Sequence, residues 1–437
     1  MSQHLLTSSM SESTLSRQSD VSEQLQILAL LGHPVGRCAD FPPLGRDDER
    51  ELKLLDSVAI CLLGNIPGDI VAVTLDRSPP LTLVLARNGN PIHEDLQASN
   101  EFFRLVKSDA PSAKLLRFVM NHSSAKLNTT RRKLALPIDT IYGLLESYEA
   151  VSFDDEFPMH NEMFRETRGS VGVRELLKGC LDSIKLHACH ELPETVADSD
   201  VDAMSCLLIT GRILRSSTFS KSVLEASLQY PAIEFLKQLD KLLLYRDAIN
   251  YIVTSKPFLH RFFPGDKIVH RWVEGPIEST GANTVGLSKT FLGAIQKRVP
   301  KFQDIHHFDA QLNNWQDSIV TLVHAHIWLI ICHTLHSNAL APDPMKLKHR
   351  SIPLQLMGSS EPSCRCCDRW IMEYREHHNV HWRTSSGHGM AYANWALAGI
   401  GAIDTAVVSH IPSFVDEKLL EITSGSSTTS NDENIHV

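Results

Sequence analysis

The sequence Pro362-Ser363-Cys364-Arg365-Cys366-Cys367 places three of the nine cysteines within four positions. Cys364 and Cys367 form a C-x-x-C pair directly after a proline and a serine. At the first turn of a helix, backbone N–H groups stabilise negatively charged sulfur, so both thiolates can face one metal ion. The stretch therefore predicts the start of a helix that carries a metal-binding or reactive cysteine cluster.

His324 stands forty residues before Cys364, in the segment Val323-His324-Ala325-His326, which opens an apolar helix pattern. A histidine at the start of a second helix can supply a third metal ligand. One neutral imidazole and two thiolates balance the charge of Zn²⁺ and leave a fourth position open, as in catalytic zinc sites. The sequence therefore predicts a Zn²⁺ site at His324, Cys364 and Cys367.

The segments around these residues alternate between strand and helix patterns, which favours an α/β layer architecture for the C-terminal third. Short apolar or β-branched runs predict strands at 267–273, 352–357 and 380–383. Apolar spacings of three to four predict helices at 287–296, 363–378 and 392–402, and one or two helices between 308 and 335.

Taken together, these features resemble the fungal-expanded deaminase-like group of the nucleotide and nucleic-acid (cytidine) deaminase superfamily. Zinc deaminases carry H-x-E followed by P-C-x-x-C, and Val323–His326 and Pro362–Cys367 are similar to those motifs. The strand pattern at 352–358 leads directly into the cysteine helix. His388-Gly389-Met390-Ala391-Tyr392-Ala393-Asn394-Trp395 is similar to the closing segment of that group. The resemblance extends from about Phe308 to Ala398, roughly a fifth of the chain.

Residue by residue, the resemblance implies that His324, Cys364 and Cys367 are the zinc ligands. The family motif has its catalytic glutamate where this chain has His326. That glutamate moves a proton from the attacking water to the leaving amine, and general acid–base catalysis contributes roughly 10²–10⁴-fold. The second departure is Ser363, which separates the motif proline from the first cysteine.

Two functions are compatible with these departures, so the sequence leaves open whether the chain is an enzyme. The first is a deaminase-like zinc-binding protein that is catalytically impaired and used for binding or regulation. The alternative is an active zinc-dependent hydrolytic deaminase of a nucleobase, nucleoside or related amidine, with His326 or Glu361 as the catalytic proton shuttle. Imidazole transfers protons near neutral pH but lacks the negative charge of a carboxylate, and it could instead bind the metal. The missing glutamate favours the first function.

The N-terminal half shows mainly helical patterns, at 96–106, 112–120, 138–150, 173–186 and 222–252, after a hairpin pattern at 70–75 and 81–85. The resulting organisation has four parts. Residues 1–23 are predicted to be disordered, and 24–260 form a mainly helical region of unassigned function. Residues 261–412 form the deaminase-like α/β/α layer domain, and 424–437 form a disordered acidic tail.

The composition restricts the class of protein and of partner. The 437 residues are 43% hydrophobic and 21% charged, which excludes a wholly disordered or collagen-like chain. The net charge of −9 does not support a nucleic-acid partner, so we expect a small base or nucleoside as ligand. No secretory signal is visible, and three histidines interrupt the apolar stretch Ser318–Leu335, so we expect no membrane span. These features predict an intracellular protein, cytoplasmic or nuclear. Deaminase-fold proteins often associate, so homo-oligomers are compatible with the resemblance.

Overall fold

The computed structural model describes residues 12–31, 43–158, 172–225, 227, 230–265, 267–274, 283–298, 313–340, 354–385, 387 and 389–423. The chain divides into two compact units. The first, here called the sheet unit, consists of Met1–Leu55, Ile70–Ile92 and Val269–Val437. The second, the helical unit, consists of Asp56–Asp69 and His93–Ile268. The division falls within α2 (Arg46–Cys61).

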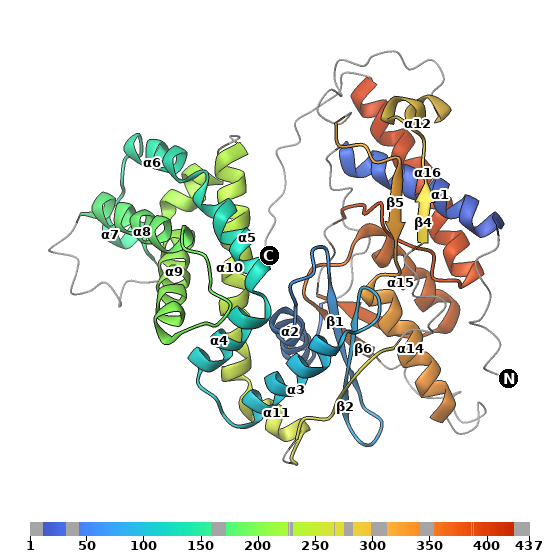
Figure 1. Ribbon diagram of the computed structural model, residues 1–437, viewed down its shortest axis with the longest axis horizontal. Coiled ribbons are helices and arrows are strands. Elements are labelled where there is room, and N and C mark those ends of the chain that lie inside the picture. Colours follow the sequence, from blue (N-terminus) through green and yellow to red (C-terminus); the bar gives the residue numbers. More distant parts are fainter. Residues whose placement is uncertain are drawn as a thin grey trace. The chain divides into compact units, whose positions relative to one another are not determined.

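The sheet unit is built on a five-stranded mixed sheet in the order β3-β2-β1-β6-β7 (Figure 1). The strands are β1 (Val71–Asp76), β2 (Thr82–Arg87), β3 (His270–Trp272), β6 (Leu354–Ser359) and β7 (His381–Thr384). β1 pairs antiparallel with β2 and β6, whereas β3 and β7 run parallel to β2 and β6 respectively. Every residue of β1 is buried, so both faces of the central strand are covered.

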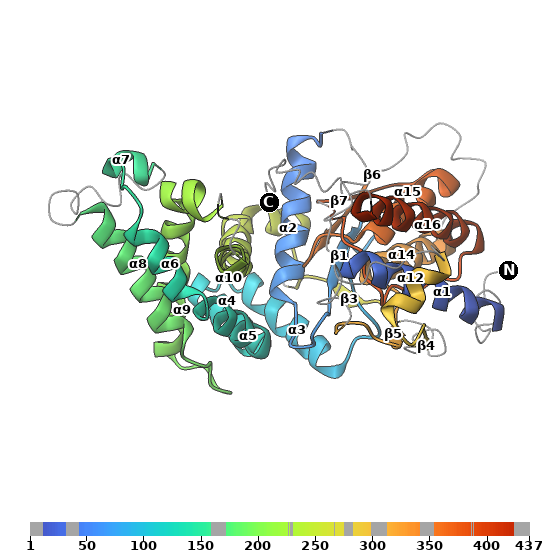
Figure 2. The same cartoon turned by 90° about the horizontal axis from the view of Figure 1, so that it is seen from above.

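Two helices pack on this sheet, a third packs on the second of these, and a fourth packs on the third. α14 (Ala325–Leu340) packs against β1 and β2, and α15 (Arg365–His378) packs against α14 and β7. α16 (Gly401–Thr423) lies between α15 and α1 (Glu12–Leu30), and Figure 2 shows these helices grouped together. Trp370, Trp382 and Trp395 are among the largest fully buried side chains. The segments that carry the cysteine and histidine motifs therefore pack directly against the apolar core of this unit.

A second, two-stranded sheet leads into the histidine motif. β4 (Asn283–Gly286) and β5 (Ser318–Thr321) pair antiparallel, with α12 (Phe291–Arg298) between them in sequence. Only two residues separate the end of β5 from His324. The position of His324 is therefore tied to the pairing of β5.

The helical unit contains a set of helices that pack through apolar faces, among them α8 against α9 and α10 against α4, α5 and α9. Its elements are α3 (His93–Lys107), α4 (Ser112–His122), α5 (Ser124–Ala135), α6 (Ile138–Glu146), α7 (Phe153–Glu156), α8 (Val173–Ala188), α9 (Asp198–Ser216), a π-helical turn at Ser220–Leu224, α10 (Tyr230–Thr254) and α11 (Lys256–Phe262). The fully buried Glu156 accepts hydrogen bonds from Tyr148 and from the Phe219 N–H.

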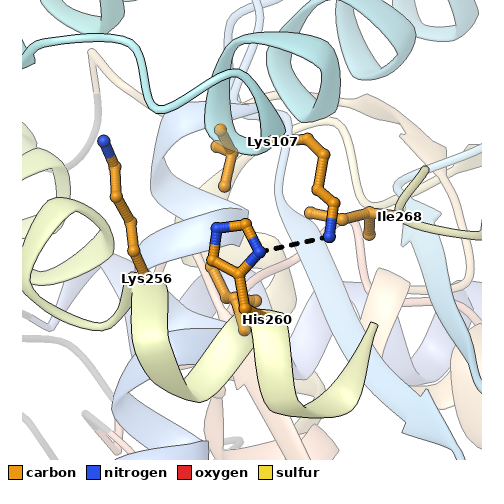
Figure 3. A pocket seen from close by; sticks show the side chains of 6 residues that line it. Lys107, Lys256, His260 and Ile268 are labelled. Carbon is orange, nitrogen blue, oxygen red and sulfur yellow. Dashed lines mark hydrogen bonds between the residues drawn. The ribbon is translucent and has the colours of Figure 1, made fainter. Parts of the chain in front are cut away.

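A small pocket of the helical unit, lined in part by Lys107, Lys256 and His260, is shown in Figure 3. The Lys107 ammonium lies 3.2 Å from His260 Nδ1 and donates to the Phe263 carbonyl at 2.6 Å. The Lys256 ammonium donates to the Ala110 carbonyl at 3.1 Å. The two lysine ammonium groups of this pocket are therefore already hydrogen-bonded to other groups of the helical unit.

Most of the predicted elements are confirmed. The strands predicted at 352–357 and 380–383 and the helix predicted at 363–378 match β6, β7 and α15. The hairpin, the strand at 267–273, and the helices at 96–106, 112–120, 173–186 and 287–296 also match observed elements. In the described part of the chain, no helix combines the length and hydropathy that a membrane span requires.

The predicted disorder over 1–23 is wrong for residues 12–23, which belong to α1. The low apolar content of this segment predicts disorder, but Val21 is buried together with the polar Gln18 and Ser22. Hydrogen bonds to the rest of the sheet unit offset the burial of Gln18. Residues 1–11 and the predicted tail at 424–437 lie outside the described residues.

The helix prediction for 308–335 is confirmed only from Ala325 onward, where α14 begins, and the helix predicted at 392–402 is wrong up to Gly401. Within 308–335, Ser318–Thr321 form the strand β5, which pairs with β4. The apolar pattern of 308–335 alone does not indicate this partner strand. Residues 389–400 form no helix and are mostly irregular, and α16 begins only at Gly401. The Asp404 carboxylate accepts hydrogen bonds from the Ala398 and Gly399 N–H groups, and Gly399 has a φ of +83°. A left-handed residue interrupts a helix, so the predicted helix at 392–402 does not form.

A single boundary was predicted near residue 260, but each of the two units is made of more than one segment of the chain. The hairpin at 70–87 lies within the predicted 24–260 region, yet β1 pairs with β6, so that Ala72 lies opposite Ser359. The sheet unit accordingly takes Ile70–Ile92 from the N-terminal half. A pairing between strands so far apart in sequence leaves no periodic signal in either segment.

Candidate metal centre

The start of α14 positions His324. The His324 carbonyl accepts the Trp328 N–H at 3.1 Å, which is the first hydrogen bond of the helix. The Asn88 side chain, which follows β2, accepts the Ala325 N–H at 2.9 Å and caps the same end. The residue that follows the β1–β2 hairpin therefore holds the N-terminus of α14, and with it His324, in place.

The start of α15 positions the two cysteines. Cys364 is the N-cap residue, with φ −74° and ψ 163°, and its Sγ accepts the Cys367 N–H at 3.4 Å. The Cys364 carbonyl accepts the Asp368 N–H at 2.9 Å. A thiol thus takes the capping role that serine or aspartate usually fills, and the one-turn spacing brings Cys367 to the same end of the helix.

His324, Cys364 and Cys367 converge on one point. His324 Nδ1 lies 3.5 Å from Cys364 Sγ and 3.4 Å from Cys367 Sγ, and one donor atom from each residue lies within 4.8 Å of the others. Zn–S bonds of about 2.3 Å and Zn–N bonds of about 2.0 Å at a tetrahedral angle separate nitrogen from sulfur by about 3.5 Å. The donors therefore have both the chemistry and the spacing to hold a metal ion such as zinc.

Burial and charge both favour a cation at this point. The exposed fractions of His324, Cys364 and Cys367 are 1%, 2% and 0%. Burial raises the pKa of Cys364, but the hydrogen bond with Cys367 and the positive charge of His324 outweigh burial and hold that pKa well below its usual range. Burial and the neighbouring Cys364 hold the pKa of Cys367 well above its usual range. Two buried thiolates repel each other, and a bound cation relieves that repulsion.

Asp368 and Gly387 pack beside the cysteines. Burial, with a smaller effect from the charge of Cys364, raises the pKa of the Asp368 carboxyl to about 7, although Ser363 donates a hydrogen bond to it. A Cβ atom built on Gly387 would lie 1.8 Å from an Asp368 oxygen. Gly387 also forms a bridge with Ser363. A side chain at position 387 would therefore displace the Asp368 carboxyl where this segment crosses the start of α15.

Residues 387 and 389–397, here called the closing segment, cover the donor group. The Arg365 N–H donates to the Met390 carbonyl at 3.0 Å, and the Tyr392 ring meets the His324 ring edge-on with centroids 6.0 Å apart. Leu322, two residues before His324, donates to the Asn394 carbonyl and accepts the Ala396 N–H. The closing segment is thus bonded to both sequences that carry the metal-binding residues.

The structure brings together three of the predicted site residues and leaves the other two outside the group. Among the described residues, His324, Cys364 and Cys367 are the histidine, cysteine and acidic residues that cluster at metal-binding distance. His326 is fully buried in the first turn of α14 but is not part of this group. Glu361 is partly buried. Burial raises the pKa of Tyr392, and the negative charge of Glu361 raises it further. A carboxylate therefore lies near the closing segment.

Sequence patterns missed Asn88, Gln18 and Asp404 as residues that support the site. Asn88 lies just beyond the predicted hairpin, and Gln18 stands in a segment predicted to be disordered. Asp404 accepts hydrogen bonds from the Trp370 indole at 3.2 Å and from the Gly399 N–H at 2.8 Å, so it joins α15 to the chain just after the closing segment. None of these roles has a local signature, because each partner is remote in sequence or part of the main chain.

We expect Asp404→Ala to lower the free energy of unfolding of the sheet unit by about 2–4 kcal/mol, because it leaves buried donors without partners. Asp404→Asn should cost less, since one amide oxygen can still accept from Trp370 and Ala398. Denaturant unfolding followed by circular dichroism measures both changes. Equal, small effects of both variants would contradict the anchoring role of Asp404.

Both variants should also change how stability depends on pH, because each removes the Asp404 carboxyl. Burial raises the pKa of Asp404, so the folded carboxyl keeps its proton at pH values where the unfolded carboxyl, with a pKa of about 3.9, has lost it. The stability that the proton contributes is complete below about pH 3.9 and declines as the pH rises through the folded pKa. The cost of Asp404→Asn should therefore be smaller at pH 7 than at pH 4.

Comparison with protein-family models, with curated proteins and with solved structures gives no match for this chain. The assignment of a candidate metal centre accordingly rests on the burial, the spacing and the chemistry of its three donors.

Proposed function

We propose that this chain is a zinc-binding protein in which His324, Cys364 and Cys367 hold one Zn²⁺ between the starts of α14 and α15. The observation that carries the proposal is the buried group of three donors with nitrogen–sulfur distances of 3.4 and 3.5 Å. A bound ion would supply positive charge to two buried thiolates and fix two helix ends to each other.

We further propose that the site is deaminase-like. This is supported by the order of the elements: a histidine at the start of one helix, then a strand, and then a C-x-x-C pair at the start of the next helix. The parallel pairing of β6 with β7 across that second helix is compatible with an α/β layer fold. A deaminase-like site implies a base or nucleoside as the ligand class, and homo-oligomers fit the same resemblance.

In this proposal the protein is catalytically impaired and serves in binding or regulation. His326 stands where the deaminase motif has glutamate, and all three metal-binding residues are at most 2% exposed. A buried site suits an ion that stabilises the fold. No disulfide joins the described cysteines, which suits a reducing compartment such as the cytoplasm or nucleus.

One observation favours the alternative, an active hydrolytic deaminase. Glu361 lies close enough to the closing segment for its charge to act on Tyr392, whose ring contacts His324. A carboxylate from this position could replace the missing shuttle. Ammonia release by the wild-type chain that is lost in Glu361→Gln would select this alternative.

Metal analysis of the purified full chain tests the zinc proposal. We expect about one zinc per wild-type chain and less than about a tenth of that in Cys364→Ser and Cys367→Ser, because each variant removes a thiolate ligand. Cys366→Ser is the matched control, since Cys366 is as buried and lies on the same helix but outside the donor group. Zinc content that is unchanged in the two ligand variants would overturn the proposal.

A further inference from the structure

One face of α1 carries polar side chains that are buried. Gln18 and Ser22 are fully buried and Gln26 is 5% exposed. Their spacing of four residues places them on the same side of the helix. Burial of a polar side chain is unfavourable unless its hydrogen bonds are satisfied, so the partners of this face show what α1 holds in place.

Gln18 binds the main chain of the closing segment with both ends of its amide. Its Nε2 donates to the Trp395 carbonyl at 2.8 Å, and its Oε1 accepts the Leu397 N–H at 2.8 Å. Ser22 Oγ accepts a second hydrogen bond from Gln18 Nε2 at 3.1 Å, which orients the amide. The side chain thus bonds to the closing segment much as a neighbouring strand would.

Gln26 makes an equivalent pair of bonds with the residue Gln316, two positions before β5. With its amide oriented to satisfy both groups, Gln26 donates to the Gln316 carbonyl at 3.0 Å and accepts the Gln316 N–H at 2.8 Å. β5 continues into Leu322, which is itself bonded to Asn394 and Ala396. The two glutamines therefore hold the two segments that meet beside His324.

We propose that α1 is a clamp that keeps the metal centre closed, with Gln18 as its positioning residue. The inference rests on the proposed zinc site and adds a control of metal retention by the N-terminal helix. When Gln18 is bound, the Trp395–Leu397 stretch stays paired with Leu322 and Tyr392 stays against His324. Without the amide, two main-chain groups lose their partners in a buried place, so opening of the segment becomes more frequent.

The test compares zinc release from full-length Gln18→Met with release from Glu23→Gln. Glu23 is the matched control because it is buried on the same helix but accepts from Ser288 and Lys297 instead of the closing segment. Transfer of zinc to a coloured chelator should be about tenfold faster for Gln18→Met than for wild type, and nearly unchanged for Glu23→Gln. Gln26→Met provides a second clamp variant and should also release zinc faster.

Cobalt substitution gives a readout that a general loss of stability would not move. We expect the visible absorption of Co²⁺ at the cysteine and histidine ligands to change in Gln18→Met and to stay the same in Glu23→Gln. Equal release rates and equal spectra in the two variants would overturn the clamp while leaving the zinc site intact. A wild-type chain that binds neither metal through Cys364 and Cys367 would instead overturn the proposed function itself.

Discussion

Removal of zinc from the full chain should destabilise the sheet unit and leave the stability of the helical unit unchanged. The three donors of the candidate centre belong to the sheet unit and are almost fully buried. Without a cation, the unit buries two cysteine side chains and an imidazole that must share protons and hydrogen bonds among themselves. At free zinc a thousandfold above Kd, binding stabilises the folded form by about 4 kcal/mol, a large part of the stability of an ordinary domain.

The positions of the tryptophans make this result measurable for each unit. All six lie in the Val269–Val437 part of the sheet unit, namely Trp272, Trp315, Trp328, Trp370, Trp382 and Trp395. Tryptophan fluorescence therefore reports on the sheet unit, whereas the far-ultraviolet circular dichroism signal includes the helices of both units. We expect a chelator to lower the midpoint of the fluorescence transition by at least about 5 °C.

The ligand variant Cys364→Ser supplies the control for chelation. It should melt at the temperature of the chelated wild type and should show no further change when chelator is added. A later transition in circular dichroism, unaffected by chelator, should mark the helical unit. If chelation left the fluorescence midpoint of the wild type unchanged, the metal would not be part of the folded sheet unit.

The candidate site was predictable because its signals are local. A C-x-x-C pair after Pro362 and Ser363 indicates a helix start, and the same helix start fixes the distance between Cys364 and Cys367. His324 could be named because it stands at the beginning of an apolar helix pattern. Each of these inferences requires only a few neighbouring residues, and the structure places the three side chains around one point.

The supporting structure was not predictable in the same way, because its partners are remote. Gln18 bonds to Trp395 and Leu397, and Asn88 caps a helix that begins at Ala325. Composition made residues 12–23 resemble a disordered segment, since the hydrogen bonds that order them are made with the other end of the chain. The strand β5 was hidden within an apolar run that continues into α14. Apolar patterns predict which residues are buried more reliably than which strands pair.

His326→Glu should raise ammonia release from at least one of cytidine, adenosine, guanine and single-stranded DNA by roughly 10²–10⁴-fold over the wild-type chain. The expectation follows from the position of His326, which lies in the first turn of α14, two residues after His324, and is fully buried. In the deaminase motif a carboxylate at this position carries the proton from water to the leaving amine. An imidazole there has no negative charge with which to accept that proton beside a cation.

Two further variants separate the effect of charge from that of shape. His326→Gln has nearly the size of the glutamate variant but cannot take up a proton, so it should stay at the wild-type level. His324→Ala combined with His326→Glu should also stay at that level, because it removes a metal ligand. Wild-type activity equal to that of His326→Glu would overturn the view that the protein is catalytically impaired, and Glu361 would then be the residue to test as the shuttle. If every variant released ammonia only at the uncatalysed rate, the absence of glutamate would not be the only cause of inactivity. The burial of His324, Cys364 and Cys367 beneath the closing segment would then account for it.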